Sequence, residues 1–212
     1  MSQDRQEGHR WFAAFYDFVT AHEDRHLRRM RQKVVGGAKG RVLEIGCGTG
    51  ATFPYYSEGL EHVVATEPDP YMLRRARKNA ARLAKTLDIQ QAPAESLPFE
   101  DASFDTVVSF FVMCTVADPL RALSEVRRVL RPGGELRFYE HVRYGHPFGA
   151  FWQDLVTPVW RWFGAGCHPN RDVESFIRSA GFTVTEIEGL KPYPPLPPAA
   201  FIRPHIKGIA TP

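Results

Sequence analysis

The glycine-rich stretch RVLEIGCGTGATFPYYS could hold a cofactor against its backbone. Glycines leave backbone N–H groups open to a ligand, and a helix that follows such a turn directs its positive end at the same place. Two kinds of site fit the spacing. Gly46, Gly48 and Ala51 match the dinucleotide fingerprint G-x-G-x-x-G/A. Glu44 and Gly50, with the same first two glycines, match the E-x-G-x-G-x-G turn of an S-adenosylmethionine (SAM) site.

The turn alone does not decide between the two cofactors, so the residues after it matter. Glu67 ends the apolar segment HVVATE, where its carboxylate could accept hydrogen bonds from both hydroxyls of a ribose. After the next apolar segment, Ala94 and Glu95 stand where an adenine-binding loop belongs. These blocks favour SAM, and Ala51 then belongs to the first turn of the following helix.

The elements that must position these residues alternate short apolar segments with longer helical ones, which is typical of a parallel sheet covered by helices. Two helices begin at Asp-Pro pairs, which can cap an N-terminus and preset the first turn. The predicted strands are 41–46, 62–67, 88–92, 104–110, 135–142, 182–190 and 201–210, and the predicted helices are 69–87 and 118–130.

The last two predicted strands are joined by KPYPPLPPAA and not by a helix. A right-handed crossover is therefore excluded, and we expect an antiparallel hairpin, residues 182–210, at the sheet edge. The sequence thus predicts a single α/β domain over residues 1–212. Its core is a Rossmann-like, seven-stranded, mostly parallel sheet with helices on both faces.

Residues 1–36 precede the first strand and read as one amphipathic helix, aromatic in its first half and basic in its second. We expect this helix to pack on the domain, either as core or as a lid over the cofactor that brings Tyr16 near the site. An alternative is that it lies in an anionic membrane interface.

Composition sets limits on the class of protein. A net charge of +3 does not indicate nucleic acid binding, and the clustered basic residues fit solvated helix faces. Cys47, Cys114 and Cys167 are far apart without a C-x-x-C pair, so neither disulfides nor a metal site is expected. The longest apolar run is too short to cross a bilayer. We expect a cytoplasmic protein, at most peripheral at the inner membrane face.

The chain resembles class I SAM-dependent methyltransferases of the methyltransferase type 11 kind in the order and spacing of three blocks. These blocks are VLEIGCGTG, AESLPFEDASFDTVV and EVRRVLRPGGEL. The resemblance implies that residues 41–142 bind SAM and release S-adenosylhomocysteine. It implies cofactor contacts from Glu44, Gly46, Cys47, Gly48, Gly50, Glu67, Pro68, Met72, Ala94, Glu95, Ser109 and Phe110.

The C-terminal half carries a second resemblance. Three segments are similar to parts of the thiol S-methyltransferase-like family, whose substrates are small hydrophobic thiols. These segments are EHV, FWQDLVTPVWRWFGAGCHPNRD and RPHIKGIA. The opening WFAAFYD, followed by basic residues, resembles bacterial phospholipid N-methyltransferases. The acceptor is therefore a small molecule or a lipid, and a SAM-binding protein without catalysis is the remaining alternative.

Methyl transfer from a sulfonium is an in-line displacement that needs positioning and the exclusion of water. The acceptor should lie beyond the carboxyl ends of strands 104–110 and 135–142, roofed by an aromatic insert at 143–172. A thiol with a pKa near 8.5 gains from a base, for which we predict His141; for an amine, Glu140 or Tyr16 could receive the proton. The predicted acceptor-side residues are Phe111, Cys114, Tyr144, Trp152 and His205.

Overall fold

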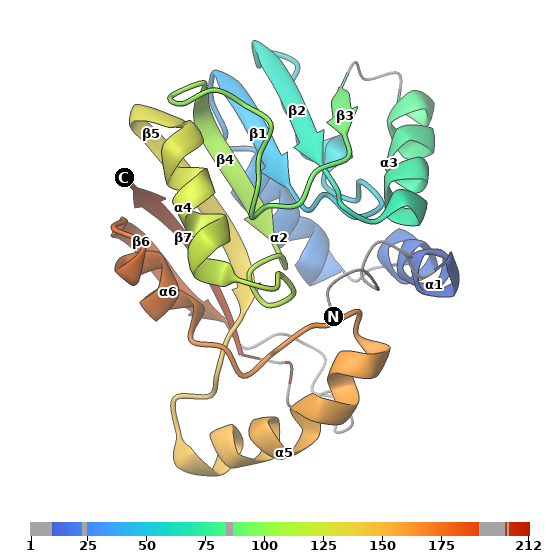
Figure 1. Ribbon diagram of the computed structural model, residues 1–212. Coiled ribbons are helices and arrows are strands. Elements are labelled where there is room, and N and C mark those ends of the chain that lie inside the picture. The colour runs from blue at the N-terminus through green and yellow to red at the C-terminus, as the bar shows by residue number, and fades with distance from the viewer. Residues whose placement is uncertain (1–9, 23–24, 84–86, 191–201, 203) are drawn as a thin grey trace.

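Seven strands form one sheet in the computed structural model, which describes residues 10–22, 25–83, 87–190, 202 and 204–212 (Figure 1). The strand order is β3-β2-β1-β4-β5-β7-β6. Strands β1 to β5 run parallel, while β7 is antiparallel to both of its neighbours. The strands are β1 (Arg41–Ile45), β2 (His62–Thr66), β3 (Asp88–Gln90), β4 (Phe104–Phe110), β5 (Leu130–His141), β6 (Thr183–Leu190) and β7 (His205–Thr211). The predicted parallel sheet with an antiparallel edge hairpin is confirmed.

Helices cover both faces of the sheet, as predicted (Figure 1). One apolar core lies between the sheet and α4 and α6, and a second lies between the sheet and α2 and α3. The helices are α1 (Arg10–Ala21), α2 (Arg25–Val35), α3 (Pro70–Arg82), α4 (Pro119–Val129), α5 (Pro147–Phe163) and α6 (Val173–Ser179), with one 3-10 turn, η1 (Phe53–Tyr55).

The Asp-Pro pairs begin helices as predicted. The Asp69 carboxylate accepts hydrogen bonds from the N–H groups of Tyr71 and Met72 at 2.7 and 2.9 Å. Asp118 accepts one from Arg121 at 3.1 Å. Each cap satisfies N–H groups that have no partner within the helix, which fixes where α3 and α4 leave the sheet.

Two helix predictions are wrong. The N-terminal segment forms two helices and not one, because α1 ends at Ala21 and α2 begins at Arg25. The turn after β1 leads into the short η1 and not into a longer helix beginning at Ala51. Helix α2 is also no lid: it buries Val34 and Val35 against the sheet and holds the Arg31 guanidinium 4.3 Å from the centre of the Phe110 ring.

Helix α5 lies beyond the end of the sheet at which β5 leads into it (Figure 1). Gln153 anchors its inner face and is fully buried. Its side-chain oxygen accepts a hydrogen bond from the Tyr144 N–H at 2.7 Å, and its amide donates to the carbonyls of Val142 and Pro169 at 3.1 Å each. One side chain thus ties the helix to the chain before and after it. In the described ranges, no helix combines the length and apolar composition needed to cross a membrane.

Replacing Gln153 with alanine should lower the free energy of unfolding by about 2–4 kcal/mol, since buried backbone groups then lose their partners. Urea denaturation followed by circular dichroism measures the change. Gln32→Ala, the same substitution at an exposed site on α2, is the control and should change stability by less than about 0.5 kcal/mol. Equal effects of the two variants would contradict the anchoring role.

Candidate active site

Three glycines shape the turn after β1. Gly46, Gly48 and Gly50 have φ angles of +56°, +58° and +82°, a region that L side chains rarely adopt. A Cβ at Gly50 would overlap the Phe53 ring, and one at Gly46 would press on Val112. The sequence pattern therefore reflects a conformational requirement at each of the three positions.

Glu67 joins this turn to the one after β2. Its carboxylate accepts hydrogen bonds from the backbone N–H groups of Gly48 at 2.8 Å and Asp69 at 2.9 Å. Burial raises the pKa of Glu67 to about 7, against the opposing effect of these two bonds. An acceptor at the end of β2, beside a glycine turn, is the arrangement that a nucleoside ribose requires.

Glu44 braces the turn from inside the fold. The carboxylate is 1% exposed and accepts hydrogen bonds from the hydroxyls of Thr52 at 2.6 Å and Tyr56 at 2.9 Å. Burial raises its pKa to about 7. Both partners belong to the segment that follows the turn, so these contacts give Glu44 a structural position. They do not support the direct cofactor contact expected for it.

The other predicted cofactor residues fall into two groups. Cys47, Met72 and Ala94 are buried around the turn, while Pro68 is exposed beside Glu67. Glu95 holds the entry to α4, because its carboxylate accepts hydrogen bonds from the N–H groups of Ala117 at 2.8 Å and Asp118 at 3.3 Å.

Ser109 and Phe110 lie within the sheet. The Ser109 hydroxyl donates to the Glu140 carboxylate at 2.7 Å, and the Phe110 ring stacks on Tyr139 with 4.8 Å between centroids. A cofactor contact for these two residues stays a prediction.

Helix α1 lies across the glycine turn. The Tyr16 ring comes within 3.4 Å of where a Cβ on Gly48 would be. Asp17 forms an ion pair with Arg75 of α3 at 2.7 Å and accepts a hydrogen bond from Asn79 at 3.1 Å. Asn79 also donates to the carbonyl of Thr49 in the turn at 2.9 Å. The helix thus covers the turn and is held there by α3, as a lid would be.

Aromatic and imidazole rings gather where β4 and β5 end. Phe111 has a φ of +62° and stacks on the His141 ring, with centroids 4.2 Å apart and an angle of 12° between planes. His205 lies opposite His141 in the β5–β7 register, and its Nδ1 is 2.7 Å from the Tyr139 hydroxyl. Burial lowers the pKa of His205, so this imidazole is neutral at pH 7.

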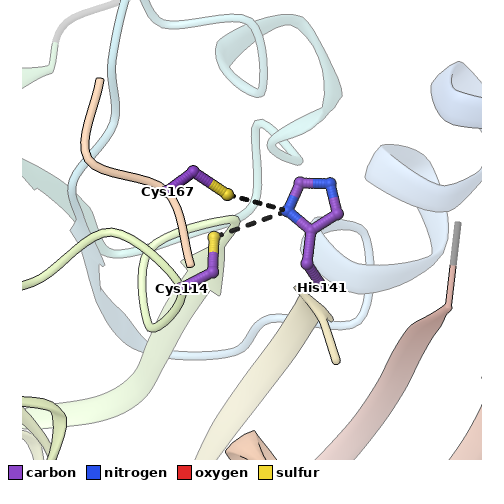
Figure 2. Close-up of side chains that lie close together, drawn as sticks. All are labelled: Cys114, His141 and Cys167. Carbon is purple, nitrogen blue, oxygen red and sulfur yellow. Dashed lines mark hydrogen bonds between the residues drawn. The ribbon is translucent and has the colours of Figure 1, made fainter. Parts of the chain in front are cut away.

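Two thiols converge on His141 (Figure 2). The Sγ atom of Cys114 is 3.4 Å from His141 Nδ1, and that of Cys167 is 3.7 Å from the same nitrogen. The hydrogen bond between the thiols lowers the pKa of Cys167, while that bond and burial raise the pKa of Cys114. One of the two sulfurs is thus the readier to lose its proton.

Glu140 lies next to this cluster but is directed away from it. The carboxylate is fully buried and accepts hydrogen bonds from Ser109 Oγ at 2.7 Å and the Val112 N–H at 3.0 Å. Burial raises its pKa, and these two bonds oppose the rise. It therefore fixes the loop after β4.

The fold brings together some of the predicted acceptor-side residues and not others. Phe111, Cys114, His141 and His205 form one cluster. The Tyr144 ring instead contacts His146. Trp152 lies on α5 and is 46% exposed, and its place beside the acceptor stays a prediction.

Sequence reasoning missed Cys167 and Arg171. The Arg171 guanidinium donates to the carbonyls of Met113 and Val116 at 2.8 Å each and so holds the loop that carries Cys114. The only signal for Cys167 was its place in GAGCHPN, within the aromatic insert expected over the acceptor.

Comparisons with known proteins identify the family of this chain. Residues 43–138 match the family model described as methyltransferase domain. Human thiol S-methyltransferase TMT1B is 38% identical over 84% of this chain and 74% of its own length. Phosphatidylethanolamine N-methyltransferase from Cereibacter sphaeroides is 38% identical over 62% of this chain and 64% of its own length.

Among solved structures, a geranyl diphosphate methyltransferase in complex with GPP and sinefungin has the same fold. Its TM-score is 0.67 at 15% identity, over 86% of this chain and 75% of that one. The family match over the SAM-binding blocks makes this protein an enzyme with SAM as its cofactor. The glycine turn and Glu67 provide the cradle and the ribose acceptor that SAM needs, so the residues present fit it. The chain belongs to the SAM-dependent methyltransferase family that includes the thiol S-methyltransferases.

Proposed function

We propose that the acceptor is a small hydrophobic thiol. The observation that carries this proposal is the cluster at the ends of β4 and β5, where Phe111 and His141 stack beside two sulfurs. A cationic amine would need a carboxylate that it can reach, and the nearby Glu140 is fully buried, with one oxygen bonded to Ser109 and Val112. The likeness to TMT1B, 38% over 84% of the chain, supports the same acceptor class.

When bound, SAM supplies a methyl group on a sulfonium that an acceptor sulfur can displace in line. The glycine turn and Glu67 would hold the cofactor, and Tyr16 on α1 would close over it. Phe111 and Tyr139 form an apolar wall that excludes water, which favours loss of the cationic charge in the transition state. The imidazole of His141 favours the thiolate form of an acceptor beside it.

His141→Ala should lower thiol methylation by about 100-fold or more, because the group that favours the thiolate is lost. SAM affinity should be nearly unchanged, since His141 lies at the end of β5 and not at the glycine turn. Turnover with a small alkyl thiol and titration calorimetry with SAM measure the two effects. His62→Ala, an exposed histidine at the start of β2, is the control and should match the parent protein. Unchanged turnover in His141→Ala would contradict this role.

Glu67→Gln should weaken SAM binding by about tenfold or more, because two charge-assisted hydrogen bonds to ribose hydroxyls are lost. The pKa of Glu67 is raised to about 7 by burial, and only its charged form accepts both bonds. SAM affinity in the parent protein should therefore fall as the pH drops below about 7, and most of this dependence should vanish in Glu67→Gln. Calorimetric titration between pH 5.5 and about 8.5 tests both, with exposed Glu61→Gln as control.

A second candidate is N-methylation of a phospholipid or small amine at a membrane surface. The observation that favours it is an apolar stripe on α5 that faces away from the protein. The stripe consists of Phe148, Phe151, Trp152, Leu155, Val159 and Trp162, which are 73, 61, 46, 56, 63 and 81% exposed. These spacings follow one face of a helix. Membrane contact is thus better placed on α5 than on the N-terminal helices, where α2 packs on the sheet.

Replacing both Phe148 and Trp162 with serine should at least halve the fraction of protein that cosediments with anionic liposomes at low salt, because two large apolar groups no longer enter the interface. Leu120→Ser, at an exposed position of α4, is the matched control and should leave binding unchanged. An absence of liposome binding in the parent protein would count against a lipid acceptor. It would leave the thiol proposal intact.

A further inference from the structure

We propose that Cys114, His141 and Cys167 form a zinc site with three protein ligands, whose fourth position takes the sulfur of the acceptor thiol. This inference rests on the proposed function, which it deepens by assigning how the thiol is bound and activated. The three donors are separated in sequence but come together at the acceptor side of the sheet (Figure 2).

The donor atoms are spaced as a tetrahedral zinc ion requires. Zn–S bonds of about 2.3 Å and Zn–N bonds of about 2.0 Å at tetrahedral angles place sulfur and nitrogen about 3.5 Å apart. The distances from His141 Nδ1 are 3.4 Å to Cys114 Sγ and 3.7 Å to Cys167 Sγ. All three donors lie within 4.8 Å of one another. Small side-chain adjustments would therefore suffice to bind the ion.

The two sulfurs share one nitrogen of His141, although Cys114 Sγ also lies 3.6 Å from the Phe111 carbonyl and 3.5 Å from the Thr115 hydroxyl. A ring nitrogen has either one proton or one lone pair, so Nδ1 cannot make a good hydrogen bond with both sulfurs at once. A metal ion placed between the three atoms binds all of them. Thiolate and imidazole donors are those that zinc prefers, and two cysteines with one histidine is a set used by catalytic zinc sites that keep an open position.

The protein backbone holds the two cysteine loops together. The His168 N–H donates to the carbonyl of Cys114 at 2.6 Å, and Arg171 bonds two carbonyls of the loop around Cys114. His141 is fixed by its stacking on Phe111 and by the β5–β7 pairing. The ligands are thus arranged by the fold before any ion arrives, as a preorganised site requires.

In this site zinc, and not the His141 imidazole alone, would favour the thiolate form of the acceptor. A thiol that coordinates zinc loses its proton to solvent, so its sulfur is a thiolate at neutral pH. This sulfur forms a bond to the methyl carbon while the methyl–sulfonium bond breaks, and the electron pair of that bond stays on the sulfur of S-adenosylhomocysteine. The product is a neutral thioether, a weaker ligand than a thiolate, which then leaves the metal. Thiol and SAM thus give thioether, S-adenosylhomocysteine and one proton.

Metal content is the first test. Protein purified with a phosphine reductant and without chelators should contain about one zinc ion per chain by mass spectrometry. Loss of any ligand should weaken zinc affinity at least about 100-fold, measured by competition with a chromogenic chelator in Cys114→Ser, Cys167→Ser and His141→Ala. Cys47→Ser is the matched control, because Cys47 lies in the glycine turn, and should keep the parent affinity. Circular dichroism shows whether each variant is folded.

A Co²⁺-substituted protein tests the open position directly. Tetrahedral thiolate coordination should give visible absorption bands, and these should shift when 2-mercaptoethanol is added and occupies the fourth position. Parent protein that binds neither zinc nor Co²⁺, or that contains only a Cys114–Cys167 disulfide, would overturn the inference. If such protein still methylates thiols, the proposed function stands alone. Metal binding without methylation of any thiol would refute the proposed function but not the metal ligands.

Discussion

The buried carboxylate of Glu140 determines the shape of the acceptor side. Burying an ionisable group is costly, and hydrogen bonds from Ser109 and Val112 offset that cost at the end of β4. These bonds hold the chain where Phe111 adopts a positive φ and turns its ring onto His141. Because neighbouring strand residues point to opposite faces, Glu140 secures the loop while His141 points into the cluster. One carboxylate therefore sets both halves of the sulfur–imidazole arrangement.

Two further carboxylates shape the cofactor side in the same manner. Glu44 holds the segment after the glycine turn through Thr52 and Tyr56, and Glu67 holds the turn itself through the Gly48 N–H. Burial raises both pKa values to about 7, so both are balanced between charged and neutral forms near neutral pH. The two carboxylates differ in their hydrogen-bond partners. Glu44 accepts from side-chain hydroxyls, whereas Glu67 accepts from backbone N–H groups at the edge of the turn. The carboxylate predicted to bind the ribose thus differs from Glu44 in its position and not in its pKa.

The sequence predicted what depends on local pattern. Buried strands are short apolar segments, which made the sheet predictable. The spacing of Gly46, Gly48 and Gly50 is typical of a turn with positive φ angles, and the Asp-Pro pairs are typical of helix N-termini. Contacts between distant segments left no such signal. The spacing of Cys114 and Cys167 did not indicate that the two side chains meet at His141, because sequence separation says nothing about loops that hydrogen bonds bring together. The sequence also did not indicate which aromatic residues of α5 face outward, since an amphipathic pattern does not say which way a helix faces.

Helix α5 connects the two unusual surfaces of this protein. Its outer face exposes large apolar side chains, while its inner face carries the buried Gln153 and leads directly into the loop of Cys167. The ion pair between Arg143 and Asp154 at 2.7 Å links the middle of the helix to the chain before it, and the hydrogen bond from Asn170 to Asp154 at 2.8 Å links it to the chain that follows. The loop of Cys167 is in turn bonded to the loop of Cys114 through the His168 N–H, while His141 belongs to β5. A hydrophobic acceptor or surface that contacts the outer face would act on the same helix that positions one sulfur of the cluster.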